Sequence, residues 1–275
     1  MFASFEICLP NLTKLVFEGI TSCTLLPALG QLPKLRELAI EGASEVEKIG
    51  PEFFGSYDNA TKIAFPKLQQ LLIVDFPKLK EWSFGAQVEQ NARLPCLQKL
   101  AIGRCQLLKQ LPEDLKYSPI KFLKIFETRS LKSVDNLPAE IEEIELRQCG
   151  NLEKVFCPPT LKELSVLQCK DLAYVEKLDS LKKLSFFNIY SEGGLSEWLL
   201  KLLRQRRLQN DSNDDFQLQL TCTKEVFPEC LEGGSYWDLI QHIPQVSCWG
   251  FDYIYYLQYS KQPYVYETNF YDILI

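Results

Sequence analysis

Apolar residues return along the chain in one fixed spacing: an apolar residue, two variable positions, a second apolar residue, one variable position and a third apolar residue. The second and third apolar residues are two positions apart, so they lie on the same face of a β-strand. A period of roughly 20–30 residues that repeats in this way predicts stacked units and not one closed globule. The spacing occurs eight times, in units that begin at Leu12, Leu35, Leu68, Leu97, Ile120, Ile141, Leu161 and Leu181.

A single unit of this length cannot cover its own apolar face, but stacked strands bury one another's inward side chains. The sequence therefore predicts an α/β solenoid of the leucine-rich-repeat type: a horseshoe with a parallel β-sheet on its concave side and an irregular convex side. Proline supports this assignment, because it cannot donate to a sheet and follows the last apolar residue of a unit at Pro27 and Pro112. We expect the residues between the apolar positions to line a concave binding surface.

The leucine spacing ends after the eighth unit, and we divide the chain accordingly. Residues 1–220 are expected to form the repeat domain, with about eight or nine repeats. Apolar residues three and four positions apart predict a helix near 195–208, on the convex side of a longer repeat rather than on a partner or a membrane. Residues 221–275 are rich in aromatic side chains, and we expect a β-rich C-terminal cap over the last apolar layer. A partner site or partial order in this segment are the alternatives.

The 275 residues carry a formal net charge of −6. A mildly acidic chain with interspersed lysine and glutamate argues against nucleic-acid binding, which needs clustered basic residues. The sequence has no run of about twenty apolar residues that could span a membrane. Its first residues lack the basic start and the long apolar run of a signal peptide. We therefore expect a soluble protein of the cytoplasm.

The ten cysteines raise the question of disulfides or a metal site. Cys105, Cys149 and Cys169 occupy the same position of their units, just after the strand, where a small buried thiol fits. There is no Cys-x-x-Cys pair and the one histidine is His242, so reduced structural thiols are favoured over disulfides or metal ligands.

Catalytic chemistry has little support in the sequence. His242 lies among apolar residues, where a structural histidine is more frequent than a catalytic one. No phosphate-binding loop occurs. Carboxylates such as Glu142 and Glu145 lie on a strand edge, without an apolar pocket that would raise a pKa. We expect a protein that is not an enzyme, with no catalytic, cofactor-binding or metal-ligating residues.

Most strand positions that are predicted to face solvent are polar, but a few carry large apolar side chains. Phe126, Leu167 and Phe187 share one strand position, so we expect them to approach one another across the sheet. An exposed apolar patch with charge at its rim is typical of a protein-binding centre. The alternative is that the C-terminal segment or another domain of the protein covers this patch. The predicted partner-binding residues are Leu72, Val74, Arg104, Phe122, Lys124, Phe126, Arg147, Leu167 and Phe187.

One stretch of the repeat region also resembles a known family. The segment from Leu26 to Ile40, LPALGQLPKLRELAI, is similar to the C-terminal repeats of plant coiled-coil nucleotide-binding leucine-rich-repeat (NB-LRR) disease resistance proteins. The later segments Phe65–Leu68 and Phe76–Trp82 follow the same style. The resemblance covers roughly residues 12–220 and is less clear in the aromatic segment that follows.

The resemblance implies a non-catalytic recognition module of an intracellular plant immune receptor. Such a module senses a pathogen effector or a guarded host protein through its concave face and contributes to autoinhibition. The sequence lacks the coiled coil and the nucleotide-binding domain, so no cofactor is implied for this chain. The implied partner is a protein, which includes the nucleotide-binding domain of a full-length receptor, and not a nucleic acid. A leucine-rich-repeat substrate adaptor of a ubiquitin ligase and a truncated decoy or inhibitor protein are the alternatives.

Overall fold

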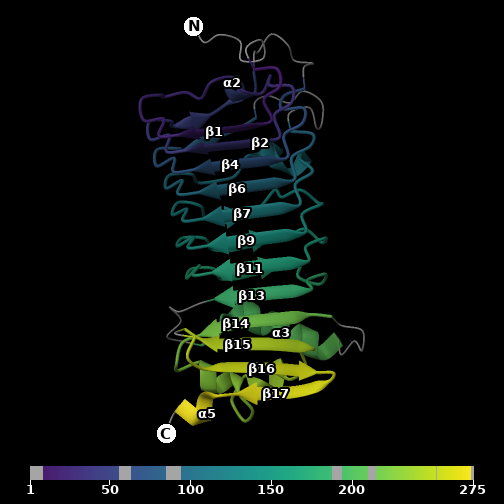
Figure 1. The fold of residues 1–275 in the computed structure, drawn as a ribbon. Helices are drawn as coiled ribbons and strands as arrows, with labels where there is room; N and C mark the ends of the chain where they lie inside the picture. Colours follow the sequence, from purple (N-terminus) through teal and green to yellow (C-terminus); the bar gives the residue numbers. More distant parts are fainter. Residues whose placement is uncertain are drawn as a thin grey trace.

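The computed structural model of the protein describes residues 9–55, 63–84, 94–187, 194–209, 215–251 and 253–273. Over these residues, its largest element is a sheet of twelve strands stacked along the long direction of the molecule (Figure 1). The first ten strands lie parallel, whereas β16 and β17 each run antiparallel to the strand before them. In spatial order the strands are β1 (Lys14–Glu18), β2 (Glu37–Glu41), β4 (Gln70–Val74), β6 (Lys99–Gly103), β7 (Phe122–Phe126), β9 (Glu143–Arg147), β11 (Glu163–Leu167), β13 (Lys183–Phe187), β14 (Gln217–Cys222), β15 (Gln245–Gly250), β16 (Tyr256–Lys261) and β17 (Tyr264–Thr268).

The eight predicted units supply the first eight strands of this sheet, which confirms the predicted parallel sheet. Equivalent apolar residues of neighbouring units lie opposite one another, so that Leu164 of β11 pairs with Ile144 and with Leu184. All three side chains are buried. Each such burial stabilises the fold by about 1.5–3 kcal/mol. The core is therefore a continuous stack that passes from each unit to the next.

The residue that directly follows each of the first seven strands of the long sheet has a left-handed backbone conformation. Arg104 and Glu127 have positive φ angles of 51° and 53° although neither is a glycine. Their N–H groups donate to the last carbonyl of the neighbouring strand, as in the 3.0 Å bond from Arg104 to Phe126. This ladder offsets the roughly 1–2 kcal/mol that a left-handed residue costs. The full set is Gly19, Gly42, Asp75, Arg104, Glu127, Gln148 and Gln168.

The residue after each left-handed position points into the core. The cysteines at this position, Cys105, Cys149 and Cys169, are buried, as the sequence predicted. Cys105 Sγ donates to the carbonyl of Gly103 at 3.3 Å, and Cys149 Sγ donates to that of Arg147 at 3.5 Å. All nine cysteines within the described residues are free thiols. The thiols therefore fill space and satisfy strand-end carbonyls.

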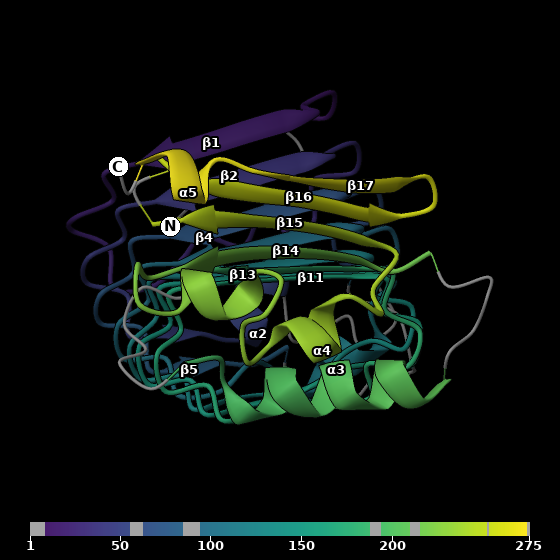
Figure 2. The ribbon, with the colours of Figure 1, turned by 90° about the horizontal axis from the view of Figure 1, so that it is seen from below.

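Short strands and turns form the side of the core opposite the long sheet. Two of these strands, β3 (Lys48–Ile49) and β5 (Glu81–Trp82), pair with each other. Three more, β8 (Ser133–Val134), β10 (Lys154–Phe156) and β12 (Tyr174–Glu176), form a second small sheet. Figure 2 shows β5 across the molecule from the long strands. The remaining elements of this part are α2 (Pro51–Phe54) and the 3-10 helix η1 (Glu113–Tyr117).

The helix expected near 195–208 is α3 (Glu197–Gln209), which lies across the core from the long strands (Figure 2). Its buried Trp198 packs edge-on against Phe186 of β13, with ring centroids 5.4 Å apart. Arg206 donates to the carbonyl of Leu181 at 2.6 Å and lies 4.5 Å from the ring centroid of Phe216. The helix therefore replaces the short strand on the return side of this unit. No helix among the described residues is long and apolar enough to cross a membrane.

The aromatic C-terminal segment continues the long sheet. The expected boundary at residue 220 lies inside β14, and β15 adds one more parallel strand before β16 and β17. Trp237 packs on Tyr259 and Tyr266, with centroid separations of 5.1 and 5.4 Å. The shorter elements of this segment are the 3-10 helix η2 (Phe227–Cys230), α4 (Trp237–Ile240) and α5 (Phe270–Ile273).

Candidate protein-binding surface

Alternate residues of each long strand point away from the core and form rows across the sheet. The strand register joins the fifth residues of successive strands into one row, which we call the fifth-position row. Phe126, Leu167 and Phe187 all lie in this row, as the sequence predicted, and Leu167 is directly opposite Phe187. The row comprises Glu18, Glu41, Val74, Gly103, Phe126, Arg147, Leu167, Phe187, Thr221 and Trp249.

The ring of Phe126 lies over the backbone of the neighbouring strand. A Cβ atom added to Gly103 would be 2.0 Å from Cζ of Phe126, so the ring occupies the space that a side chain would fill. Lys124 lies beside this ring, with its Nζ 5.9 Å from the ring centroid, and it pairs with Glu145 at 2.8 Å. Phe126 is therefore partly buried and not fully exposed.

The C-terminal end of the fifth-position row is more aromatic than the sequence analysis anticipated. Phe251, in the turn after β15, lies edge-on to Phe187 with ring centroids 6.3 Å apart. Its side chain is 49% exposed, and its N–H donates to the carbonyl of Cys222 at 2.9 Å. Trp249 joins the same row through its pairing with Thr221. Trp249 and Phe251 are two positions apart in the sequence, as outward residues of one strand are, and this spacing could have predicted the extension.

Val74 is a correction to the sequence analysis. We expected its side chain to face water, but it is only 3% exposed, although it lies in the outward-facing fifth-position row. Val74 pairs with Gly103, and because Gly103 has no side chain, the ring of Phe126 can lie over this part of the sheet. Val74 therefore offers no surface for direct contact with a partner.

The other predicted residues lie on the outward face but not in one patch. Leu72 and Phe122 are partly buried and belong to other rows, at the third position of β4 and the first position of β7. Arg104 and Arg147 are exposed; Arg147 lies directly opposite Phe126, and the backbone N–H of Arg104 donates to the carbonyl of Phe126. The structure therefore brings Phe126, Arg147, Leu167 and Phe187 into one row and leaves Leu72 and Phe122 beside it.

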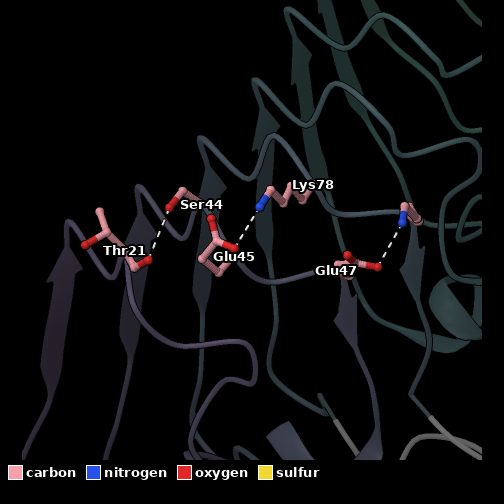
Figure 3. A network of polar contacts seen from close by, with 6 residues as sticks. Thr21, Ser44, Glu45, Glu47 and Lys78 are labelled. Atoms are coloured by element: carbon pink, nitrogen blue, oxygen red, sulfur yellow. Dashed lines mark hydrogen bonds and ion pairs between the residues drawn. The ribbon is translucent and has the colours of Figure 1, made fainter.

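Lysine and glutamate side chains pair between neighbouring units over much of the surface. Figure 3 shows the pair of Lys78 with Glu45, whose charged atoms are 2.7 Å apart, beside the bond from Ser44 to Thr21. Lys80 pairs with Glu47 in the same way, at 2.8 Å. Exposed pairs of this kind contribute about 0–1 kcal/mol each. Among the described residues, Arg104 and Arg147 form no such pair. These two cations are therefore available to an acidic group of another molecule.

The carboxylates of this face differ in their environment. Lys162 and then Lys121 hold the pKa of Glu142 below its ordinary value through hydrogen bonds and charge. Burial, and then the neighbouring Glu163, raise the pKa of Glu143. The face therefore carries two adjacent carboxylates in different environments: lysines stabilise the charge of Glu142, whereas burial and a neighbouring carboxylate destabilise the charge of Glu143.

Comparison with known proteins shows that this chain is similar to plant disease resistance proteins. A putative disease resistance protein of Arabidopsis thaliana is 36% identical over 155 residues, which are 49% of this chain and 11% of that protein. The putative disease resistance RPP13-like protein 1 of Arabidopsis thaliana is 29% identical over 199 residues, or 58% of this chain and 18% of that protein. The putative disease resistance protein RGA1 of Solanum bulbocastanum is 27% identical over 177 residues, or 63% of this chain and 16% of that protein. No protein-family model matches the sequence.

The long, mainly parallel sheet with few helices is compatible with an α/β fold of the leucine-rich-repeat kind. The chain is related to plant disease resistance proteins, and the predicted resemblance to the NB-LRR type is confirmed. The chain spans less than a fifth of the length of each of these three relatives.

Proposed function

We propose that this chain is a leucine-rich-repeat solenoid that serves as the protein-recognition module of a plant immune receptor. The fifth-position row lies on its concave face and binds a pathogen effector or a guarded host protein. The same module contributes to autoinhibition of the receptor through contact with its nucleotide-binding domain. The module itself has no catalytic role and acts in the cytoplasm, where its buried free thiols stay reduced.

The observation that carries this proposal is the partly exposed row of Phe126, Arg147, Leu167 and Phe187. Aromatic and arginine side chains dominate binding energy at protein interfaces, because they bury a large area and form charge-assisted hydrogen bonds. The lysines nearby are already paired with glutamates, as Lys124 is with Glu145. The row therefore combines an apolar centre with unpaired positive charge, and this combination suits an acidic protein surface with an apolar anchor.

The proposal is tested with alanine variants of the row. The tagged chain is expressed in leaf tissue as wild type, as Phe126→Ala with Phe187→Ala, and as Phe156→Ala, and co-purifying proteins are quantified by mass spectrometry. Phe156 is the matched control, because it is an exposed aromatic residue on the return side that packs edge-on against Tyr174, with ring centroids 5.9 Å apart.

We expect the double variant to lose proteins that wild type and Phe156→Ala retain in equal amounts, with little change in Tm. Equal recovery of all proteins by the three forms would contradict the proposed binding face. A large fall in Tm of the double variant would show that the two rings belong to the core instead.

A further inference from the structure

Three cysteines from separate segments converge in the C-terminal part of the molecule. Cys222 is the last residue of β14, Cys230 is the last residue of η2, and Cys248 lies in β15. Their three Sγ atoms all lie within 4.8 Å of one another, and those of Cys222 and Cys248 are 3.8 Å apart. Each side chain is at most 2% exposed. Within the part of the chain that the structure describes, this is the one group with the spacing of metal ligands.

This cluster differs from the repeat cysteines in that three sulfur atoms converge, whereas Cys149 and Cys169 share only a pairwise sulfur–sulfur hydrogen bond. Cys105 and Cys169 each donate to the carbonyl of a strand end, at 3.3 and 3.6 Å. In the three-cysteine cluster, the sulfur atoms contact other sulfur atoms. A thiol is a weak hydrogen-bond donor and a weak acceptor, so three buried thiols that face one another satisfy each other poorly.

The spacing of the sulfur atoms fits a shared metal ion. Metal–sulfur bonds of about 2.3 Å place two sulfur ligands about 3.8–4.0 Å apart at tetrahedral or trigonal angles. The separation of Cys222 from Cys248 is already 3.8 Å, so Cys230 needs only a small side-chain adjustment to complete the set. The three residues come from two strands and a 3-10 helix, whose backbones are fixed by hydrogen bonds such as that from Phe251 N–H to Cys222 O.

The chemistry of the three donors selects the kind of cation that fits this site. Each cysteine offers one sulfur atom, and all three side chains are buried. A metal ion supplies the positive charge that thiolates need in an apolar site, and soft thiolate ligands select zinc(II) and copper(I).

We propose that Cys222, Cys230 and Cys248 bind one thiophilic d¹⁰ metal ion, zinc(II) or copper(I), as thiolate ligands. Each thiol that becomes a ligand releases its proton to solvent, and no ligand is oxidised. Copper(I) is satisfied by three sulfur ligands, whereas zinc(II) takes a fourth ligand. The ion joins η2 to β14 and β15 and so fixes the C-terminal strands on the last parallel units. This inference does not depend on the proposed binding face.

The test uses the full 275-residue chain, refolded without oxygen in a phosphine reductant with zinc(II) alone, copper(I) alone or no metal. Bound metal is counted by mass spectrometry after gel filtration, and Tm is measured for each sample. We expect one ion per chain and a rise in Tm of about 5–15 °C with the ion that binds. Retention of zinc or of copper decides between the two ions.

The control variant is Cys105→Ala, which removes an equally buried thiol outside the cluster. We expect Cys105→Ala to keep the metal and Cys248→Ala to lose it. Sulfur-to-metal charge-transfer absorption of the copper(I) or cobalt(II) form of the wild type reports thiolate ligands even if Cys248→Ala does not fold. Three results would each overturn the proposal. The wild-type chain could retain neither zinc nor copper after refolding, Cys248→Ala could retain as much metal as the wild type, or two of the three cysteines could form a disulfide.

Discussion

The ring of Phe126 covers Gly103 so closely that a Cβ atom on Gly103 would be 2.0 Å from Cζ of the ring. The two residues lie directly opposite each other on β7 and β6. The position of Phe126 on the outward face therefore depends on the absence of a side chain one unit away. A side chain at position 103 should therefore destabilise the fold.

We predict that Gly103→Ala destabilises the protein by about 1–3 kcal/mol, because the added methyl group forces the ring of Phe126 to move. The free energy of unfolding in urea measures this change. In a Phe126→Ala background the same substitution is expected to cost much less, since the ring that clashes is gone. An equal cost in both backgrounds would show that Gly103 is required for another reason.

Arg147 is predicted to act in binding and not in stability. It is exposed and lies between Phe126 and Leu167 in the fifth-position row. We expect Arg147→Glu to weaken binding of the captured partner about tenfold or more and to shift the free energy of unfolding by less than about 0.5 kcal/mol. Arg129→Glu, which makes the same charge change on exposed Arg129 outside the row, should leave affinity unchanged. Titration of the partner by calorimetry tests both variants, and equal losses of affinity would refute the role of Arg147.

Two adjacent glutamates are predicted to influence stability with opposite signs. Because the pKa of Glu143 is raised in the folded protein, its charged form favours the unfolded chain, and this penalty is present above the raised pKa and absent at acidic pH. Glu143→Gln should therefore raise Tm at pH 7 by about 1–3 °C, and the gain should vanish near pH 4.

The pKa of Glu142 is lowered by Lys162 and Lys121, so its charged form favours the folded state above its ordinary pKa. Glu142→Gln should therefore lower Tm slightly at pH 7 and have no effect in acid. Thermal unfolding followed by circular dichroism between pH 4 and pH 8 measures both substitutions. If both substitutions changed Tm in the same direction at pH 7, the result would contradict this account of the local charges.

Arg206 is predicted to hold α3 against the units before it. Its guanidinium donates to the carbonyls of Leu181 and Leu178, at 2.6 and 3.3 Å, and stacks on Phe216. We expect Arg206→Ala to cost about 1–3 kcal/mol, because buried carbonyls lose a charged donor. The neighbouring Arg207 is exposed, and Arg207→Ala should be nearly neutral. Chemical denaturation distinguishes the two, and a neutral Arg206→Ala would show that apolar contacts alone dock the helix.

The strand register could be predicted from the sequence because the side-chain period of a strand is two. Once Leu164 and Val166 are assigned to the core, Ser165 and Leu167 must face outward, and parallel stacking then aligns Leu167 with Phe187. This reasoning uses only residues of the same unit. It therefore succeeds wherever neighbouring units follow the same pattern.

Features that depend on contacts between units were harder to predict. Val74 is buried although it lies in an outward-facing row, and its neighbours along that row, Gly103 and Phe126, lie in the next two units. The three-cysteine cluster forms because β15 continues the parallel sheet, and the many aromatic residues near Trp249 obscured that strand in the sequence. A spacing rule for metal ligands could not find the cluster, since Cys222, Cys230 and Cys248 come from three separate elements.

The central claim is that a protein partner contacts the outward face of the long sheet at the fifth-position row. Site-specific photocrosslinking tests it most directly, with a photoreactive phenylalanine analogue placed at Leu167 or, as the control, at Phe156 on the return side. We predict a crosslinked partner at Leu167 and none at Phe156 when the chain is irradiated in leaf tissue. A crosslink at Phe156 without one at Leu167 would place the partner on the opposite side and contradict the account.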